Sequence, residues 1–196
     1  MKAGPAVTRP RLSACERREA ILVAAKRVFG QSGYHAATTR EIAAAAGVSE
    51  ALLYQHFPGK RQLFTELVEA AAEDLERRVL AARTAADPAA AGLEAYFDFV
   101  EQESEFYRVF FRQAPLEDPE HQLLWRRLWR RFIDLLRDDG TLSEAGAHAL
   151  AGMLNELALW WLEEAGLTRA AVVDRAIRYA RAVCETEVDD GRAAAD

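Results

Sequence analysis

Two short helical segments meet at a single glycine, Gly47, and this arrangement restricts the fold of the N-terminal part more than any other pattern. Thr38 or Thr39 is expected to cap the first segment and Ser49 the second, because hydroxyl side chains accept hydrogen bonds from free amides at helix N-termini. Glycine permits the left-handed backbone that a tight turn requires. The pattern predicts a helix-turn-helix unit, although an ordinary helical hairpin would give the same signals.

Helical signals continue through the rest of the chain. Sustained alternation of β-branched residues is absent, while Ala, Leu, Glu and Arg dominate. We therefore predict an all-α fold, in which a three-helix helix-turn-helix domain (residues 13–60) is joined by a long connecting helix to a helical C-terminal domain (61–188). Residues 1–12 are expected to form a flexible basic arm and residues 189–196 a disordered tail.

Local signals set the expected helix boundaries. Ser13 and Glu16 form a capping box before the first helix, which Gly30 with Gly33 is expected to end. The connecting helix is expected to run from Lys60 to about Ala82. Further joints are expected at Asp87-Pro88, Gly92 and Asp118-Pro119.

The net charge of −6 is unevenly distributed along the 196 residues. Residues 1–61 carry ten basic and four acidic side chains, a balance of +6, and the remainder carries fifteen basic and twenty-seven acidic, a balance of −12. A basic head on an acidic body suits a protein that attracts phosphate at one end only.

Several protein classes lack their usual signals here. No apolar stretch is long enough to span a membrane and residues 1–12 lack the apolar centre of a secretion signal, so we expect a cytoplasmic protein without a membrane partner. Cys15 and Cys184 are far apart and lack partners at ligand spacing, which predicts neither a disulfide nor a metal site. Nucleophile-elbow, zinc-protease and phosphate-loop motifs are absent, so neither an enzyme nor a cofactor is expected.

A longer motif specifies the family. It comprises Gly33-Tyr34-His35-Ala36-Ala37-Thr38-Thr39-Arg40-Glu41-Ile42-Ala43, then Ala46-Gly47-Val48-Ser49, Leu53-Tyr54, His56-Phe57-Pro58, Lys60 and Leu63-Phe64. This order closely resembles the N-terminal domain of the tetracycline-repressor (TetR) family over about residues 14–65. The resemblance implies a homodimeric repressor that binds a palindromic DNA operator and is released when a small-molecule effector enters each body. A transcriptional activator of the same fold, or a helical adaptor that binds protein and not DNA, remains the alternative.

The resemblance also assigns candidate DNA contacts. Thr39 and Arg40 lie where the family meets the DNA backbone, and Arg40 can also reach a base. Tyr54 and His56 are expected to bind phosphate, and Lys60 suits a point contact with phosphate. The alternatives are that Tyr54 is a half-buried core aromatic, which is compatible with a phosphate contact, and that His56 is a capping or core histidine. Base reading is expected from Glu50, Ala51, Leu52 and Gln55. Glu50 and Leu52 depart from the residues usual in the family, so the operator sequence is not predicted.

The aromatic-rich body supplies candidates for an effector pocket. Most of these side chains would serve equally as core, but the resemblance places the pocket among the connecting helix and those that follow. The expected pocket residues are Tyr96, Phe99, Val100, Tyr107, Phe110, Trp125, Trp129 and Trp160. An aromatic pocket favours a hydrophobic or aromatic effector, whose identity is not predicted.

The last two predicted helices resemble those that build the family's dimer. The expected interface residues are Leu150, Met153, Leu157, Val173, Ile177 and Ala180. A monomeric core would use the same apolar stripe, so the dimer follows from the resemblance and from the small amount of DNA that one reading helix can contact.

Overall fold

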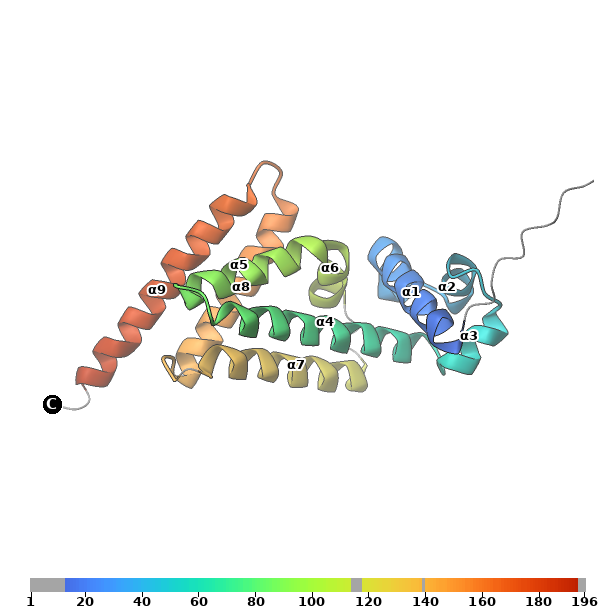
Figure 1. Cartoon of the computed structure of the whole chain (residues 1–196), viewed down its shortest axis with the longest axis horizontal. Helices are drawn as coiled ribbons and strands as arrows, with labels where there is room; N and C mark the ends of the chain where they lie inside the picture. Colours follow the sequence, from blue (N-terminus) through green and yellow to red (C-terminus); the bar gives the residue numbers. More distant parts are fainter. Residues whose placement is uncertain (1–12, 114–117, 139, 194–196) are drawn as a thin grey trace, which may run out of the picture. The chain divides into compact units, whose positions relative to one another are not determined.

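The computed structural model describes residues 13–113, 118–138 and 140–193. This part of the chain is all-α, as predicted, and no strand occurs in it. Its helices are α1 (Ala14–Ala36), α2 (Thr39–Ala45), α3 (Glu50–His56), α4 (Lys60–Ala82), α5 (Pro88–Gln102), α6 (Ser104–Gln113), α7 (Pro119–Arg137), α8 (Glu144–Glu163) and α9 (Arg169–Ala193) (Figure 1). The chain divides into two compact units at Phe64 and Thr65. We call them the head and the body.

The helix starts follow the predicted caps. The Ser13 hydroxyl accepts from the amide of Glu16, and the Glu16 carboxylate accepts from the amide of Ser13, which completes the capping box. Of the two threonines considered for α2, Thr38 is the cap, and it forms a second capping box with Glu41. Each box satisfies amides that have no partner inside the helix.

Two glycines in the head adopt left-handed backbone. Gly47 has φ 68°, which makes the turn between α2 and α3 possible and agrees with the prediction from its position. Gly33 has φ 76° and interrupts α1 without ending it, since the helix continues to Ala36. The expected end at Gly30 with Gly33 thus coincides with a break in the helical backbone at Gly33, beyond which helical hydrogen bonding resumes for one short stretch.

An aromatic cluster holds the head together. Phe29, Tyr34 and Phe64 are buried, and the Tyr34 ring lies 5.8 Å from that of Phe29 and 4.8 Å from that of Phe64. Ile42 and Leu53 are also fully buried and connect α2 and α3 to the same core. The small helices thus obtain their stability from packing, since helices of this length are marginal alone.

The core of the body joins α5, α8 and α9. Phe97, Leu154, Val172 and Ala176 are essentially inaccessible to solvent within it. Figure 1 shows α4 and α7 side by side and running in the same direction, and the ion pairs Arg127–Glu69 and Arg131–Glu76 connect them. Helices α4 and α7 thus lie together at the edge of the core that α5, α8 and α9 form.

Two boundaries in the body differ from the prediction. Gly92 lies inside α5 and does not mark a joint, because Asp87 caps the helix and Pro88 occupies its first turn. The final helix extends to Ala193, past the expected end at 188, since no proline interrupts the run and a single glycine costs a helix only about 1 kcal/mol. The expected arm at residues 1–12 lies outside the described residues. Among those described, no helix is long and apolar enough to cross a membrane.

Candidate nucleic-acid interface and ligand cavity

A chain of hydrogen bonds connects α2 to α3 on the predicted reading surface. The Thr39 hydroxyl donates to Oε1 of Glu50 at 2.7 Å and lies 3.1 Å from the Tyr54 hydroxyl. A hydroxyl has one proton, and that of Thr39 goes to the carboxylate, so Tyr54 donates to Thr39. The Arg40 guanidinium lies 4.0 Å from the other oxygen of Glu50. Four of the predicted contact residues therefore form one connected group.

The remaining predicted contacts on α3 differ in exposure. Ala51 and Gln55 are exposed, whereas Leu52 and His56 are half-buried. Tyr54 is 50% exposed and Arg40 keeps 88% of its side chain exposed, so both are accessible to a partner. The structure thus presents an accessible surface on α2 and α3 in which the acidic Glu50 is already bonded to its neighbours.

Lys60 has a role within the head that the sequence did not reveal. Its ammonium donates to the carbonyl oxygens of Tyr34, His35 and Ala37 at 2.8, 3.1 and 3.0 Å and lies 4.6 Å from the centre of the Tyr34 ring. These bonds use all three of its protons and satisfy carbonyls at the C-terminus of α1. Burial lowers the pKa of the Lys60 ammonium. Lys60 thus caps the C-terminus of α1, and its contact with DNA phosphate stays a prediction.

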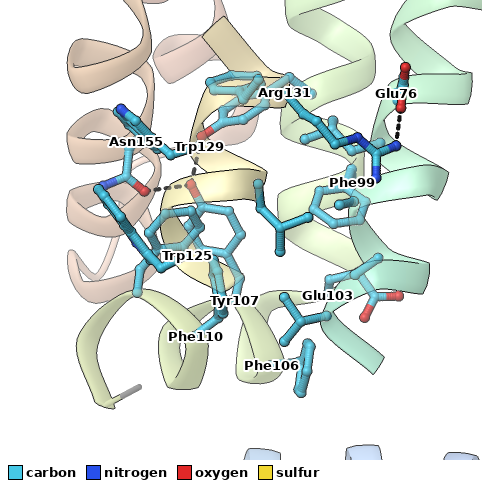
Figure 2. A pocket seen from close by; sticks show the side chains of 18 of the residues that line it. Glu76, Phe99, Glu103, Phe106, Tyr107, Phe110, Trp125, Trp129, Arg131 and Asn155 are labelled. Carbon is cyan, nitrogen blue, oxygen red and sulfur yellow. Dashed lines mark hydrogen bonds and ion pairs between the residues drawn. The ribbon is translucent and has the colours of Figure 1, made fainter. Parts of the chain in front are cut away.

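The body contains a cavity of about 100 Å³. A single water molecule needs only about 10–15 Å³ of such space, so the cavity has room for an organic group. Side chains from α4 to α8 line it, and most are apolar: Val68, Ala71, Ala72, Leu75, Tyr96, Phe99, Phe106, Tyr107, Phe110, Phe111, Trp125, Leu128, Trp129, Phe132 and Leu135. Figure 2 shows the Arg131–Glu76 pair and Asn155 on opposite sides of it.

A buried hydrogen-bond relay lies in the cavity wall. The hydroxyls of Tyr96 and Tyr107 are 2.6 Å apart, and Tyr107 donates to Oδ1 of Asn155 at 2.9 Å (Figure 2). Burial raises the pKa of both phenols well above the usual value, so both remain protonated at neutral pH. The relay is therefore a neutral polar element inside an apolar wall.

Comparison with known proteins gives a consistent result for the head. Residues 21–67 match the family model described as "Bacterial regulatory proteins, tetR family". The chain is 41% identical over 114 residues to the HTH-type transcriptional activator FasR of Mycolicibacterium smegmatis, which covers 56% of this chain and 52% of FasR. It is 45% identical over 64 residues to the nucleoid occlusion factor SlmA of Photorhabdus laumondii, which covers 32% of each protein. The chain thus matches about half the length of FasR and a third of SlmA.

Solved structures extend the likeness to the whole fold. A tetR-family transcriptional regulator from Streptomyces coelicolor superimposes with a TM-score of 0.75 over 91% of this chain and 84% of that one, at 22% identity. The fatty acid degradation regulator FadR from Bacillus halodurans superimposes with a TM-score of 0.72 over 86% of this chain and 95% of that one, at 18% identity. Residues 21–67 therefore form a TetR-family N-terminal domain. The described chain has the fold of solved TetR-family regulators.

In this TetR-family fold, most of the predicted pocket residues do meet at one cavity. Six of the eight line it, whereas Val100 is fully buried in the body core and Trp160 is 39% exposed on α8. Neither lines this cavity, because helical spacing alone does not distinguish a cavity wall from core or surface. The prediction missed the α4 residues and Asn155. Asn155 carried a usable signal, since it is a lone amide within the apolar run of α8.

The residues expected at a dimer interface pack within the single chain. Leu150, Val173 and Ala180 are buried in the body core, and Met153, Leu157 and Ile177 are half-buried against it. The exposed side of α8 instead carries Ala145, Ala149, Gly152, Glu156 and Trp160. No group of three or more His, Cys, Asp or Glu side chains suitable for a metal occurs among residues 13–113, 118–138 and 140–193.

Proposed function

We propose that this TetR-family regulator is a homodimeric repressor, located with the chromosome in the cytoplasm, that leaves a palindromic operator when a small apolar effector enters the body. The supporting observation is the course of α4. This helix begins at Lys60 in the head, and five of its later residues (Val68, Ala71, Ala72, Leu75 and Glu76) line the cavity. A ligand that displaces α4 therefore acts on an element continuous with the DNA-binding domain.

DNA binding is assigned to α2 and α3. Arg40 supplies an exposed cation, Tyr54 an exposed hydroxyl, and Ala51 and Gln55 an exposed face of α3 that suits the major groove. One such helix reads only a few bases, so two heads on half-sites about one helical turn apart would give the specificity that a regulator needs.

The dimer is proposed to form through the exposed sides of α8 and α9. Ala145, Ala149 and Gly152 are exposed at helical spacing, which allows a second helix to approach closely. Trp160 and Tyr179 are 39% and 49% exposed and would supply apolar area, a use of large exposed aromatic side chains common at interfaces. The residues first expected there are buried or half-buried within the single chain, and their part in an interface stays a prediction.

Coupling between ligand and DNA is proposed to pass between α4 and α7. Arg131 of α7 pairs with Glu76 of α4 beside the cavity. A second ion pair, Arg127–Glu69, joins the same two helices nearer their N-termini. An effector that fills the cavity would alter the separation of these helices and shift α4. The two heads of the dimer would then no longer match successive grooves, because binding favours one conformation over the other.

A gel-shift assay on DNA from upstream of the protein's own coding sequence tests this function. We expect a shifted band at low salt and its loss in the double variant Arg40→Ala, Lys60→Ala. Folding of the variant is checked by circular dichroism, because Lys60 also caps α1. An unshifted band for the wild type at low salt would favour a helical adaptor that binds protein and not DNA.

Activation in place of repression is a second candidate, favoured by the name of the relative that is 41% identical, the activator FasR. Transcription of the target promoter by purified RNA polymerase separates the two. Fewer transcripts on addition of the protein support repression, whereas more transcripts support activation.

A further inference from the structure

The chemical nature of the effector follows from the direction of the hydrogen-bond relay, if the cavity is an effector site as proposed above. Tyr107 has one hydroxyl proton, and it goes to Oδ1 of Asn155. The 2.6 Å contact between the two phenols must therefore use the proton of Tyr96. Donation runs in one direction, from Tyr96 to Tyr107 to Asn155, and neither phenol has a proton left for a ligand.

The free donor of this relay is the amide nitrogen of Asn155. Its two protons have no partner among the described residues, while its oxygen accepts from Tyr107. Hydrogen bonds in a chain polarise one another, so an amide whose oxygen accepts is a better donor through its nitrogen. Asn155 is also the accessible end of the relay, because it is half-buried whereas Tyr96 and Tyr107 are only 3% and 5% exposed.

The charges around the cavity disfavour an anionic ligand. Arg131 is the one basic side chain among the described lining residues, and its guanidinium already pairs with Glu76. Glu103 adds a second carboxylate to the lining. A carboxylate ligand would lose its hydration without gaining a free cation, which is costly in an apolar site. The indole N–H groups of Trp125 and Trp129 can donate and cannot accept, so they also suit an acceptor.

We propose that the cavity recognises a neutral carbonyl group, such as that of a ketone, ester or amide, carried on an apolar chain or ring, and that the Asn155 amide nitrogen donates to its oxygen. The aromatic walls then bind the apolar part of the ligand, and the Asn155 amide at the end of the relay selects a polar group that accepts a hydrogen bond. A free carboxylate and a free amine bind less tightly than the corresponding carbonyl compound.

Tryptophan fluorescence tests this directly, because Trp125 and Trp129 line the cavity. The full-length protein is titrated with 2-octanone, octane, octanoate and octylamine, which differ in the group at one end. We expect 2-octanone to bind, and the ratio of its affinity to that of octane is the reference for the variants, because one neutral hydrogen bond to the carbonyl contributes about fivefold to that ratio. Octanoate should bind more than about tenfold more weakly than 2-octanone, because its charge must be desolvated.

Two variants test whether Asn155 is the residue that binds the carbonyl oxygen. Asn155→Leu keeps the size of the side chain but frees the Tyr107 proton, so it is made together with Tyr107→Phe. It should lower the ketone-to-octane ratio about fivefold relative to Tyr107→Phe alone, with Asn155→Ala as a substitute if the leucine variant does not fold. Tyr96→Phe should keep most of the preference, because the Tyr96 proton is directed to Tyr107. If the ketone-to-octane ratio is unchanged in both variants at position 155, or if octanoate or octylamine binds as tightly as 2-octanone, the carbonyl inference is wrong and the proposed effector site still stands. If none of the four compounds binds, both the carbonyl inference and the proposed effector site are wrong.

Discussion

The Thr39 hydroxyl on α2 donates a 2.7 Å hydrogen bond to Oε1 of Glu50, the first residue of α3. Glu50 was expected to read bases, yet this contact and the Arg40 guanidinium 4.0 Å away engage both of its carboxylate oxygens within the head. The side chain can therefore orient α3 against α2 and place Arg40, whereas its negative charge opposes the approach of phosphate.

Glu50→Gln tests which role is dominant. Glutamine retains an oxygen that accepts from Thr39 but removes the charge, so we expect DNA binding to strengthen about fivefold at low salt, with the gain shrinking as salt screens it. Fluorescence anisotropy with labelled upstream DNA measures this. Weaker binding by the glutamine variant to that DNA, with unrelated DNA unaffected, would show that Glu50 reads a base.

Lys60→Ala should destabilise the head. The substitution removes three hydrogen bonds to the C-terminus of α1, and we expect a loss of about 1 kcal/mol in the free energy of unfolding after allowance for partial exposure. Arg40→Ala is the matched control, because its exposed side chain should weaken DNA binding without lowering stability. Urea unfolding and anisotropy separate the two effects. Unchanged stability in Lys60→Ala would mean that the lysine acts only as a DNA contact.

Gly47→Ala should also destabilise the head, through the backbone alone. A Cβ at position 47 meets no atom within 4 Å, but φ is 68°, so an alanine there costs about 1 kcal/mol. Gly92→Ala is the contrasting control, since Gly92 lies inside α5 and its new Cβ would touch only Val79 at an ordinary 3.8 Å. That variant should gain up to about 1 kcal/mol of helix stability. Equal effects at the two sites would contradict this assignment of the turn.

The sequence predicted the head better than the body, and the reason is physical. Caps such as Ser13 and the turn at Gly47 depend on neighbours within a few residues, so local pattern determines them. Lys60 shows the limit of such reasoning. Its bonds reach 23 to 26 residues back along the chain, and no local signal announces them.

The body depends on contacts between distant helices. The family resemblance placed Phe99 and Val100 equally in the predicted pocket, yet only Phe99 lines the cavity. The two side chains differ in direction by the rotation between consecutive helical residues, and only the packing of α4 and α7 decides which direction is open. Asn155 could be noticed as a lone amide, but its relay to Tyr107 spans 48 residues.

The buried phenols make stability depend on pH in alkali. Burial raises the pKa of Tyr96 and Tyr107 in the folded state, whereas unfolding returns both to about 10. Above that pH the unfolded chain binds fewer protons than the folded one, so the free energy of unfolding should fall as pH rises. Urea titrations from pH 9 upward measure the slope, and the double variant Tyr96→Phe, Tyr107→Phe should flatten it. An unchanged slope would show that these phenols do not cause the loss.

Selection of bound fragments from sheared genomic DNA, followed by sequencing, tests the regulator most directly. The wild-type protein should retain fragments that share two inverted half-sites about one helical turn apart, bound on the order of a thousandfold or more tightly than unrelated DNA. Retention of fragments without a shared sequence, or of none at physiological salt, would contradict a sequence-specific dimeric regulator.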